Sequence, residues 1–207
     1  RAEIVEIDYE NQDALENICC ETDVIIHAAG MNSQACVENS AAALKFNGEI
    51  TSRLVKAANL ARVSRFIYLS TAHVYSSPLI GIINEETLTK NPHPYATSNL
   101  VGENSVISIC SLGETEGIVF RLSNTFGYPV VKNSNCWSLL LNDLCRQAVE
   151  TRELTLQSSG LEERDFIGLS SVCNIVEYFV INQTIIGQGS IFNIGSGISY
   201  SILEVLA

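Results

Sequence analysis

The sequence predicts an α/β protein built on a doubly wound parallel sheet, and two observations carry this prediction. Short apolar segments alternate along the chain with longer segments whose apolar residues recur at helical spacing. The apolar segments are nearly continuous, as is typical of parallel strands that are buried on both faces. The crossovers of such a sheet place ligands at the carboxyl ends of its strands.

The first elements follow from local composition. A strand is expected at residues 4–8, and a second, buried strand at residues 23–29 (DVIIHAA), which end in small side chains. Apolar residues at helical spacing predict a helix over residues 38–61. The next apolar segment, RFIYLS at residues 65–70, predicts another buried strand.

A polar segment with several prolines, residues 84–94, predicts a loop that leads into a helix at residues 95–110. The segment GIVFRL predicts a strand at residues 117–122, and an amphipathic helix is expected at residues 136–149.

Shorter elements complete the chain. Three further strands are expected at residues 154–157, 164–169 and 190–194. A helix is expected at residues 171–181, with Ser170 or Ser171 as its N-cap. The sequence SILE at residues 201–204 matches a capping box and predicts the start of a last helix.

The regular alternation weakens after about residue 130. We therefore expect residues 1–130 to form the main sheet domain and residues 131–207 to form a smaller lobe, some segments of which return to the main sheet.

Composition narrows the classes of function. Hydrophobic residues make up 46% of the 207 residues and charged residues 17%, which excludes a disordered chain. The longest apolar run is shorter than the roughly 18 residues of a membrane span. The net charge of −11 speaks against nucleic acid as a partner, because phosphate binding requires a basic face.

The seven cysteines form no CxxC pair, and the three histidines do not join them at the spacing of zinc ligands. No metal site is expected. Reduced, mostly buried thiols predict a cytoplasmic protein.

Three segments at expected strand ends or at a helix start carry polar or small residues. The small residues of HAAG (27–30) would let a flat ligand approach the backbone, although a tight turn also requires small residues. His27 alone is more typical of a structural histidine. A hydroxyl at Ser70 or Thr71 suits either a substrate contact or a buried cap. To act as a base at neutral pH, Tyr95 requires a nearby positive charge or hydrogen bonds to its phenolate. Asn99, one turn later, supplies no charge but can hydrogen-bond a hydroxyl.

Seven segments in order resemble the extended short-chain dehydrogenase/reductase family, specifically its NAD-dependent epimerase/dehydratase group that modifies nucleotide sugars. They are HAAG, FNGEITSRLVKAA, RFIYLSTAHVY, PYATSNLVGE, RLSNTFGYP, RDFIGL and FNIGSG. The resemblance covers nearly the whole chain. It implies a Rossmann-like fold, NAD or NADP as cofactor and a nucleotide-sugar substrate.

The resemblance assigns roles by position. Thr71 and Tyr95 match the catalytic pair that holds the reacting sugar oxygen and exchanges a proton with it, and Asn99 stands at the third catalytic position. For the cofactor it implies contacts from Tyr95, from Asn99 at the lysine position, and from the following residues: Asp8 at the adenine, Ala28, Ala29, Gly30 and Asn47. For the substrate it implies His73, Asn124 and Arg164, with arginine suited to a diphosphate.

Several positions depart from the family pattern. Asn99 replaces the lysine that holds the nicotinamide ribose and lowers the pKa of the tyrosine. Ala72 and His73 stand where 4,6-dehydratases carry Asp-Glu, which speaks against dehydration by that pair. Gly168 follows RDFI where an aromatic residue or histidine is usual.

The Gly-rich first turn that binds the cofactor pyrophosphate has no match, so we expect the sequence to begin near the third strand of the family fold and to lack its first βαβ unit. The last helix is expected to be cut at Ala207.

Three functions therefore remain open. The first is an active NAD(P)-dependent nucleotide-sugar epimerase or reductase. The second is an impaired pseudo-enzyme that binds NAD(P), and the third is a binding module of the same fold. The resemblance also implies a homodimer formed through the helices at residues 38–61 and 95–110.

Overall fold

The computed structural model describes residues 3–131, 134–182 and 189–207. The chain forms two compact units. The first consists of Arg1–Arg121 with Gln183–Asn193, and the second of Leu122–Asn182 with Ile194–Ala207. Each unit has its own sheet.

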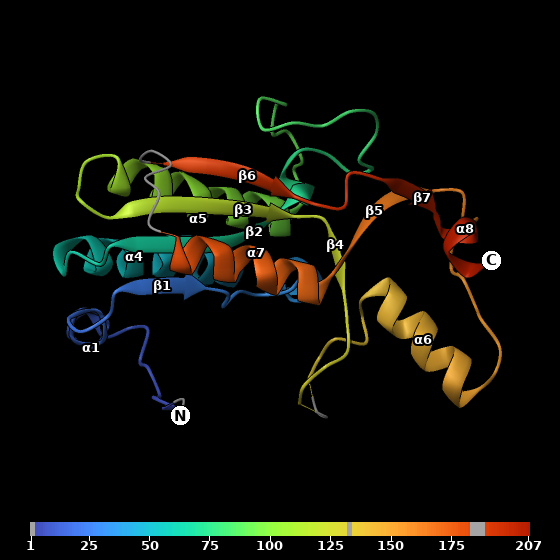
Figure 1. The fold of residues 1–207 in the computed structure, drawn as a ribbon, viewed down its shortest axis with the longest axis horizontal. Coiled ribbons are helices and arrows are strands. Elements are labelled where there is room, and N and C mark those ends of the chain that lie inside the picture. The colour runs from blue at the N-terminus through green and yellow to red at the C-terminus, as the bar shows by residue number, and fades with distance from the viewer. Residues whose placement is uncertain (1–2, 132–133, 183–188) are drawn as a thin grey trace. The chain divides into compact units, whose positions relative to one another are not determined.

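The first unit carries a four-stranded sheet in the order β1-β2-β3-β6, which Figure 1 shows as parallel arrows. In chain order its elements are α1 (Gln12–Cys19), β1 (Val24–His27), α2 (Ser33–Glu38), α3 (Ser40–Ala43), the π-helix η1 (Leu44–Ile50), α4 (Thr51–Leu60), β2 (Arg65–Thr71), the 3₁₀-helix η2 (Ala72–Val74), α5 (Pro94–Cys110), and most of β3 (Glu116–Leu122) and β6 (Ser190–Ile194). β1 and β2 pair in parallel, with Val24 opposite Arg65. The α/β class with a parallel, Rossmann-like sheet is therefore confirmed.

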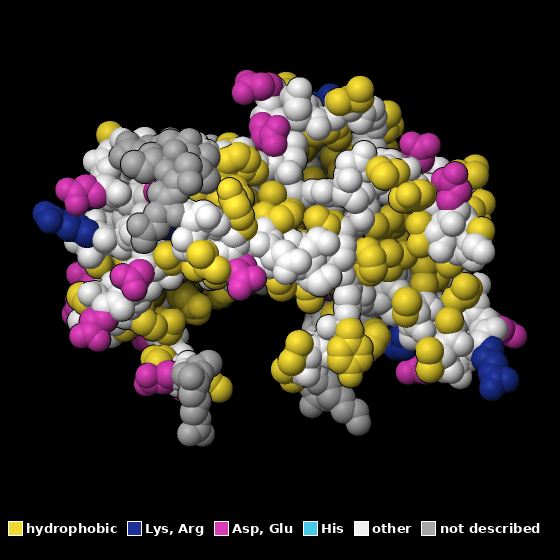
Figure 2. Space-filling model, in the orientation of Figure 1, with side chains coloured by type: hydrophobic (Ala, Val, Ile, Leu, Met, Phe, Trp, Pro, Cys, Tyr) yellow, Lys and Arg dark blue, Asp and Glu magenta, His cyan; other side chains and the backbone are white. Residues whose placement is uncertain are grey.

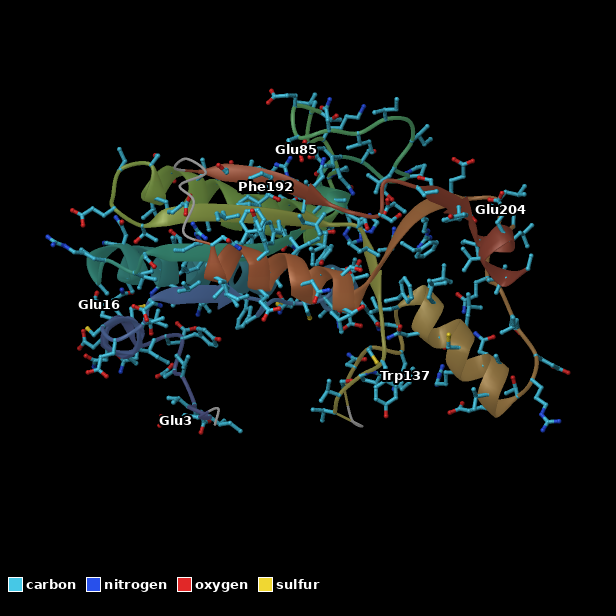
Figure 3. The ribbon with its side chains drawn as sticks, in the orientation of Figure 1. Glu3, Glu16, Glu85, Trp137, Phe192 and Glu204 are labelled. Atoms are coloured by element: carbon cyan, nitrogen blue, oxygen red, sulfur yellow. The ribbon has the colours of Figure 1, made fainter. Side chains whose placement is uncertain are left out.

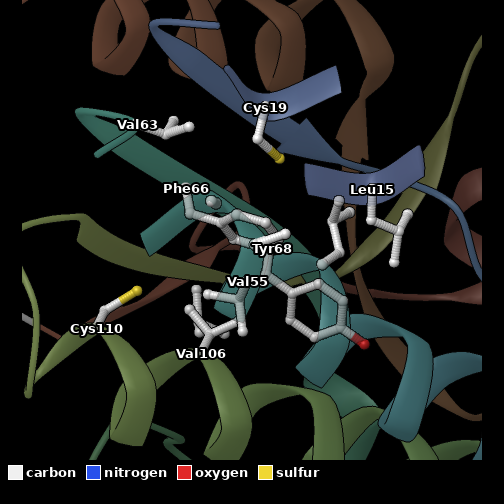
Figure 4. Packing of buried hydrophobic residues seen from close by; sticks show 12 residues of the cluster. Leu15, Cys19, Val55, Val63, Phe66, Tyr68, Val106 and Cys110 are labelled. Carbon is white, nitrogen blue, oxygen red and sulfur yellow. The ribbon is translucent and has the colours of Figure 1, made fainter. Parts of the chain in front are cut away.

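The hydrophobic core of this unit lies between the sheet and its helices (Figure 4). Phe66 and Tyr68 project from β2 towards Val55 of α4 and Val106 of α5, and all four are almost completely buried. The period of two along a strand explains why alternate residues of β2 meet the helices. Leu15 of α1 belongs to the same cluster.

The second unit carries a three-stranded sheet in the order β4-β5-β7. Its elements are β4 (Asn124–Phe126), α6 (Leu140–Glu150), β5 (Glu163–Gly168), α7 (Leu169–Ile181), β7 (Ser199–Ser201) and α8 (Ile202–Leu206). β4 and β5 pair in parallel, whereas β5 and β7 are antiparallel. Ser201 and Glu204 form the expected capping box at the start of α8.

Two expected strands are absent from the described residues. Residues 4–8 have no partner strand there, and Ile4 is 98% exposed. Residues 154–157 are also irregular, because the Thr155 N–H donates to Gln147 Oε1 at 2.7 Å instead of to a neighbouring strand. Composition suggested both strands, but a strand forms only where another strand satisfies its backbone.

The expected serine cap of α7 is wrong. The helix begins at Leu169 with Gly168 as N-cap, and Ser170 and Ser171 lie inside its first turn. Gly168 has extended backbone angles, φ −67° and ψ 138°, which allow the chain to turn directly from β5 into α7.

The structure also adds elements that the sequence reading missed. α1 begins at an Asn11 cap, whose side chain accepts from the Ala14 N–H. The helix expected at residues 38–61 is confirmed from Ser40 to Leu60, but it contains the π-helix η1. β4 and β7 have only three residues each, too few for an apolar pattern to indicate them.

Candidate functional site

Thr71 and Tyr95 come together at the carboxyl end of β2. Thr71 is the last residue of β2, and its Oγ1 accepts from the His73 N–H at 3.2 Å, which caps η2. Tyr95 stands in the first turn of α5, behind Pro94 and the N-cap His93. Burial raises the pKa of the Tyr95 phenol, and a hydrogen bond with the Thr71 side chain lowers it in part. The tyrosine is therefore a neutral phenol at pH 7 in the free protein.

Asn99, one helical turn after Tyr95, is turned into the protein. Its side chain accepts from the Tyr68 hydroxyl at 3.0 Å and donates to the Tyr95 carbonyl oxygen at 2.8 Å. The residue is only 6% exposed. Asn99 therefore fixes the first turn of α5 but brings no positive charge to the Tyr95 phenol.

A buried polar chain continues from Asn99 towards β1. The Tyr68 hydroxyl also interacts with the Thr51 side chain, and Thr51 Oγ1 lies 3.0 Å from His27 Nε2. Figure 4 shows the Tyr68 ring within the apolar cluster and its hydroxyl oxygen pointing out of it. Burial lowers the pKa of His27 to about 4, so this histidine is neutral. His27 is structural, as its position alone suggested.

Asn47 lies in the π-helix η1 and is 1% exposed. Its Oδ1 accepts from the Met31 N–H at 2.8 Å, and its Nδ2 donates to Ser98 Oγ at 3.0 Å. The Asn47 side chain therefore ties the segment after β1 to α5. π-helical turns are frequent at functional sites, and here one places an amide between the segment after β1 and α5, the helix that carries Tyr95.

The segment that follows β1 is accessible to solvent. Ala28 and Gly30 are exposed, and Ala29 is half-buried. Their small size leaves backbone accessible to a flat ligand at the carboxyl end of the strand, where the expected cofactor would lie. The Asp8 side chain accepts from the Glu10 N–H at 2.9 Å and is otherwise exposed.

These residues fit a dinucleotide only in part. Residues 28–30 and Asp8 present accessible atoms, whereas the Asn47 and Asn99 amides are engaged inside the protein.

A buried ion pair between Arg121 and Glu103 is hydrogen-bonded to Ser70 near the end of β2. Arg121 of β3 donates to both carboxylate oxygens of Glu103 in α5, with Nη2 at 2.7 Å from Oε2. Ser70 Oγ donates to the same carboxylate at 2.5 Å. Arg121 also donates to the Tyr75 hydroxyl at 2.8 Å. The network joins β2, β3 and α5 immediately next to Thr71.

The loop before α5 is attached to β6. Glu85, labelled in Figure 3, accepts from the Asn193 N–H at 2.7 Å. Asn193 Oδ1 in turn accepts from the Tyr75 hydroxyl at 2.8 Å. Phe192, also labelled there, packs edge-on against Phe120, with 6.2 Å between ring centroids. Glu85 therefore attaches the start of the expected loop at residues 84–94 to β6.

A pocket of about 190 Å³ opens beside Tyr95. Its lining residues are Ser33, His73, Ser77, Asn91, His93, Tyr95 and Ala96. It includes His73, which the sequence assigned to the substrate, and it includes His93, which sequence reasoning missed. The signal for His93 was its place immediately before Pro-Tyr at a helix start.

Asn124 and Arg164 lie in the second unit. Asn124 begins β4, and its Nδ2 donates to the Asp165 carbonyl oxygen at 3.0 Å. Arg164 lies on β5, opposite Tyr200 of β7. The neighbouring Asp165 carboxylate accepts from Ser123 Oγ at 2.7 Å and from the Gly197 N–H at 2.7 Å. Asp165 therefore binds together the segments that carry Asn124 and the loop after β6.

The described residues hold no cluster of three or more side chains able to bind a metal ion. Each helix in the described part of the chain is too short or too polar to cross a membrane. All seven cysteines are unpaired.

Residues 1–195 match the model of the NAD dependent epimerase/dehydratase family. The human dTDP-D-glucose 4,6-dehydratase is 31% identical over 158 residues, which cover 75% of this chain and 42% of that protein. The dTDP-glucose 4,6-dehydratase of Streptomyces niveus is 23% identical over 199 residues, or 94% of this chain and 56% of that protein. The chain spans about half the length of these curated relatives.

Solved structures show the same fold. The UDP-glucuronic acid 4-epimerase of Bacillus cereus, crystallised with UDP-glucuronic acid and NAD, aligns with a TM-score of 0.82 at 22% identity, over 96% of this chain and 61% of that chain. RMD from Pseudomonas aeruginosa, crystallised with NADPH, aligns with a TM-score of 0.80 at 22% identity, over 100% of this chain and 72% of that chain. With the match over residues 1–195, these findings show that the chain belongs to the NAD-dependent epimerase/dehydratase family.

Proposed function

We propose that this chain is the catalytic part of an NAD(P)-dependent enzyme that epimerises or reduces a nucleotide sugar, with Thr71 and Tyr95 as its acid/base pair. The observation that carries the proposal is the interaction between the Thr71 and Tyr95 side chains, beside a pocket that Tyr95 lines. A hydroxyl pair of this kind can hold a sugar oxygen and exchange a proton with it.

The roles of the two residues follow from their contacts. Thr71 Oγ1 is held by the His73 N–H, so its own proton is directed to an acceptor such as the Tyr95 oxygen or a sugar oxygen. Tyr95 as the phenol donates its proton to a sugar carbonyl in reduction, and as the phenolate it accepts a proton from a sugar hydroxyl in oxidation. A bound nicotinamide would supply the hydride acceptor or donor.

For the cofactor, we propose contacts from Asp8, the exposed strand end at residues 28–30, and the Tyr95 hydroxyl. Asn47 and Asn99 act on the cofactor through the segments that they hold. Asn124 and Arg164 are proposed to bind the nucleotide diphosphate, to which a guanidinium is suited. His73 is proposed to contact the sugar, since it lines the pocket.

Epimerisation or reduction is favoured over dehydration because residues 72 and 73 are Ala and His, not an acidic pair. A weakly active NAD(P)-binding pseudo-enzyme is the second candidate. Asn99 favours it, because its engaged amide cannot replace the charge of a lysine beside Tyr95.

For partners, we propose a homodimer and no nucleic acid. Acidic side chains are scattered over the face drawn in Figure 2, and basic ones stand apart from each other, in line with a net charge of −11. Phosphate binding requires grouped basic residues. The cytoplasm remains the predicted location.

The test uses the full-length protein with NAD⁺ or NADP⁺, a panel of UDP-, dTDP- and GDP-sugars, and absorbance at 340 nm. We expect one sugar to produce a reduced cofactor. Tyr95→Phe should lower turnover about 10²-fold or more, because general acid/base catalysis contributes that much. Tyr178→Phe, at an exposed tyrosine of α7, is the control and should keep full turnover.

Full turnover in Tyr95→Phe would refute the acid/base assignment. Cofactor binding without a response to any sugar would favour the pseudo-enzyme.

A further inference from the structure

The pocket beside Tyr95 has the size and chemistry of a site for one sugar ring. Its volume of about 190 Å³ lies below the roughly 300 to 1,000 Å³ of sites that enclose a whole drug-sized ligand. Hydroxyls, an amide and two imidazoles line it. The lining has no carboxylate, although the chain has 23 acidic residues against 12 basic ones, so the pocket favours a neutral or anionic polyol over a cation.

Asn91 places the two histidines at this pocket. Its Nδ2 donates to the His73 carbonyl oxygen at 2.7 Å, and its Oδ1 accepts from the His93 N–H at 3.0 Å. Both ends of the Asn91 amide are therefore used to join the end of η2 to the start of α5. The two rings are held on neighbouring segments of the pocket wall.

The ring of His93 has a defined orientation. Its Nδ1 accepts from the Tyr95 N–H at 3.2 Å and so serves as the N-cap of α5. An imidazole nitrogen that accepts carries no hydrogen, so in the neutral ring the hydrogen is on Nε2. No group among the described residues engages Nε2.

We propose that His93 contacts the substrate: its Nε2–H donates a hydrogen bond to an oxygen of the sugar ring that occupies this pocket, next to the oxygen that Tyr95 protonates. This inference rests on the proposed nucleotide-sugar function. The cap on Nδ1 couples the contact to the backbone of Tyr95, so a single side chain positions both the helix start and the sugar. His93 is thus a residue that determines sugar specificity.

The two roles of His93 can be separated by substitution. His93→Ser keeps an N-cap acceptor and removes the ring. His93→Gln removes the favourable cap and places an amide N–H near the position of Nε2. His93→Ala removes both functions. We would measure melting temperatures and the dissociation constants of UDP, UDP-glucose, dTDP and dTDP-glucose by calorimetry, using the full-length protein with its cofactor.

In the wild type we expect the sugar to add affinity beyond the bare nucleotide for at least one pair. His93→Ser should weaken binding of that sugar nucleotide about three- to tenfold, the range of one net hydrogen bond, with the bare nucleotide and the melting temperature unchanged. His93→Ala should show the same loss of binding and a lower melting temperature. His93→Gln should recover part of the sugar affinity despite its lower melting temperature.

Sugar binding in His93→Ser equal to the wild type would overturn the inference, since His93 would then be only a cap. An equal loss for nucleotide and sugar nucleotide would overturn it too. A wild type that binds none of the four probes would instead refute the proposed function, and the inference with it.

Discussion

Asn99 affects the proposed chemistry of Tyr95 because it brings no positive charge to the phenol. A lysine at this position would place a cation one helical turn from the Tyr95 phenol. The asparagine instead joins the Tyr68 hydroxyl to the Tyr95 carbonyl oxygen. Burial then raises the pKa of Tyr95 without an opposing charge, and Thr71 alone favours the phenolate. The protein keeps the geometry of its helix start, and a smaller fraction of the Tyr95 side chain is ionised at neutral pH than a lysine at position 99 would allow.

Asn99→Lys should move the alkaline rise of the oxidation rate to lower pH by about one to three units, the usual effect of a cation next to an acid. The sign follows because a positive charge favours the phenolate, so the raised pKa of Tyr95 falls. The measurement is the pH profile of kcat for sugar oxidation.

Asn99→Met is the control, since it has a similar length and no charge. An equal shift in Asn99→Met would show that loss of the Tyr68 contact, and not charge, is the cause.

His27 makes the stability of the protein depend on pH. Its pKa is about 4 in the folded chain and near 6.5 when unfolded, so its contribution is complete above pH 6.5 and is lost as the pH falls towards 4. Between pH 7 and pH 5 the free energy of unfolding should fall by about 2 kcal/mol from this group. Urea unfolding at the two pH values measures it.

In His27→Gln the difference between pH 7 and pH 5 should be smaller by that amount, because glutamine does not titrate. An unchanged difference in His27→Gln would assign the pH dependence to other groups.

η1 and α5 approach each other closely at Gly102. A Cβ added at Gly102 would lie 2.6 Å from the Asn47 carbonyl oxygen and 2.7 Å from the Tyr68 hydroxyl. Only glycine lets the two helices meet at this distance. The approach brings Asn47 within reach of Ser98 and Tyr68 within reach of Asn99.

Gly102→Ala should therefore lower the free energy of unfolding by about 1 to 3 kcal/mol, the usual cost of overpacking. Alanine would otherwise stabilise a helix interior, so the sign itself tests the contact. Asn104→Ala, at an exposed site on the same helix, should be neutral or stabilising. Denaturant unfolding of the two variants measures these changes in the free energy of unfolding. A Gly102→Ala variant more stable than the wild type would disprove the close approach.

The first unit carries exposed apolar side chains on the helices of the proposed dimer. Leu44 of η1 is 45% exposed and Val101 of α5 is 40% exposed. Single exposed apolar residues are ordinary on a protein surface. The interface is supported instead by the position of Leu44 and Val101 on two helices that pack against each other.

Sedimentation of the full-length protein should give the mass of a dimer. Val101→Glu should shift it towards the monomer, because a buried unpaired carboxylate is costly at an apolar interface. Leu112→Glu, after the end of α5, is the control and should leave the mass unchanged. A monomeric wild type, or a dimer that both variants retain, would contradict the interface.

Periodicity determined the type and order of the long elements. The apolar strands β1, β2, β3 and β6 and the helix α5 are all where the pattern placed them, because strand and helix periods depend on neighbours a few residues away. The order of motifs also indicated the family, and the match over residues 1–195 confirms it. Failures were local: residues 4–8 and 154–157 had strand composition without a partner strand.

Tertiary structure decided what each polar side chain does. The family resemblance assigned Asn47 and Asn99 to the cofactor. In the fold, the amides of these two residues form hydrogen bonds with Ser98, Met31, Tyr68 and Tyr95 from other turns and elements. The sequence indicated no role for His93. In the fold, its side chain caps α5 and lines the pocket. Local patterns specify backbone periods, whereas a hydrogen bond between residues 31 or 51 positions apart exists only once the chain has folded.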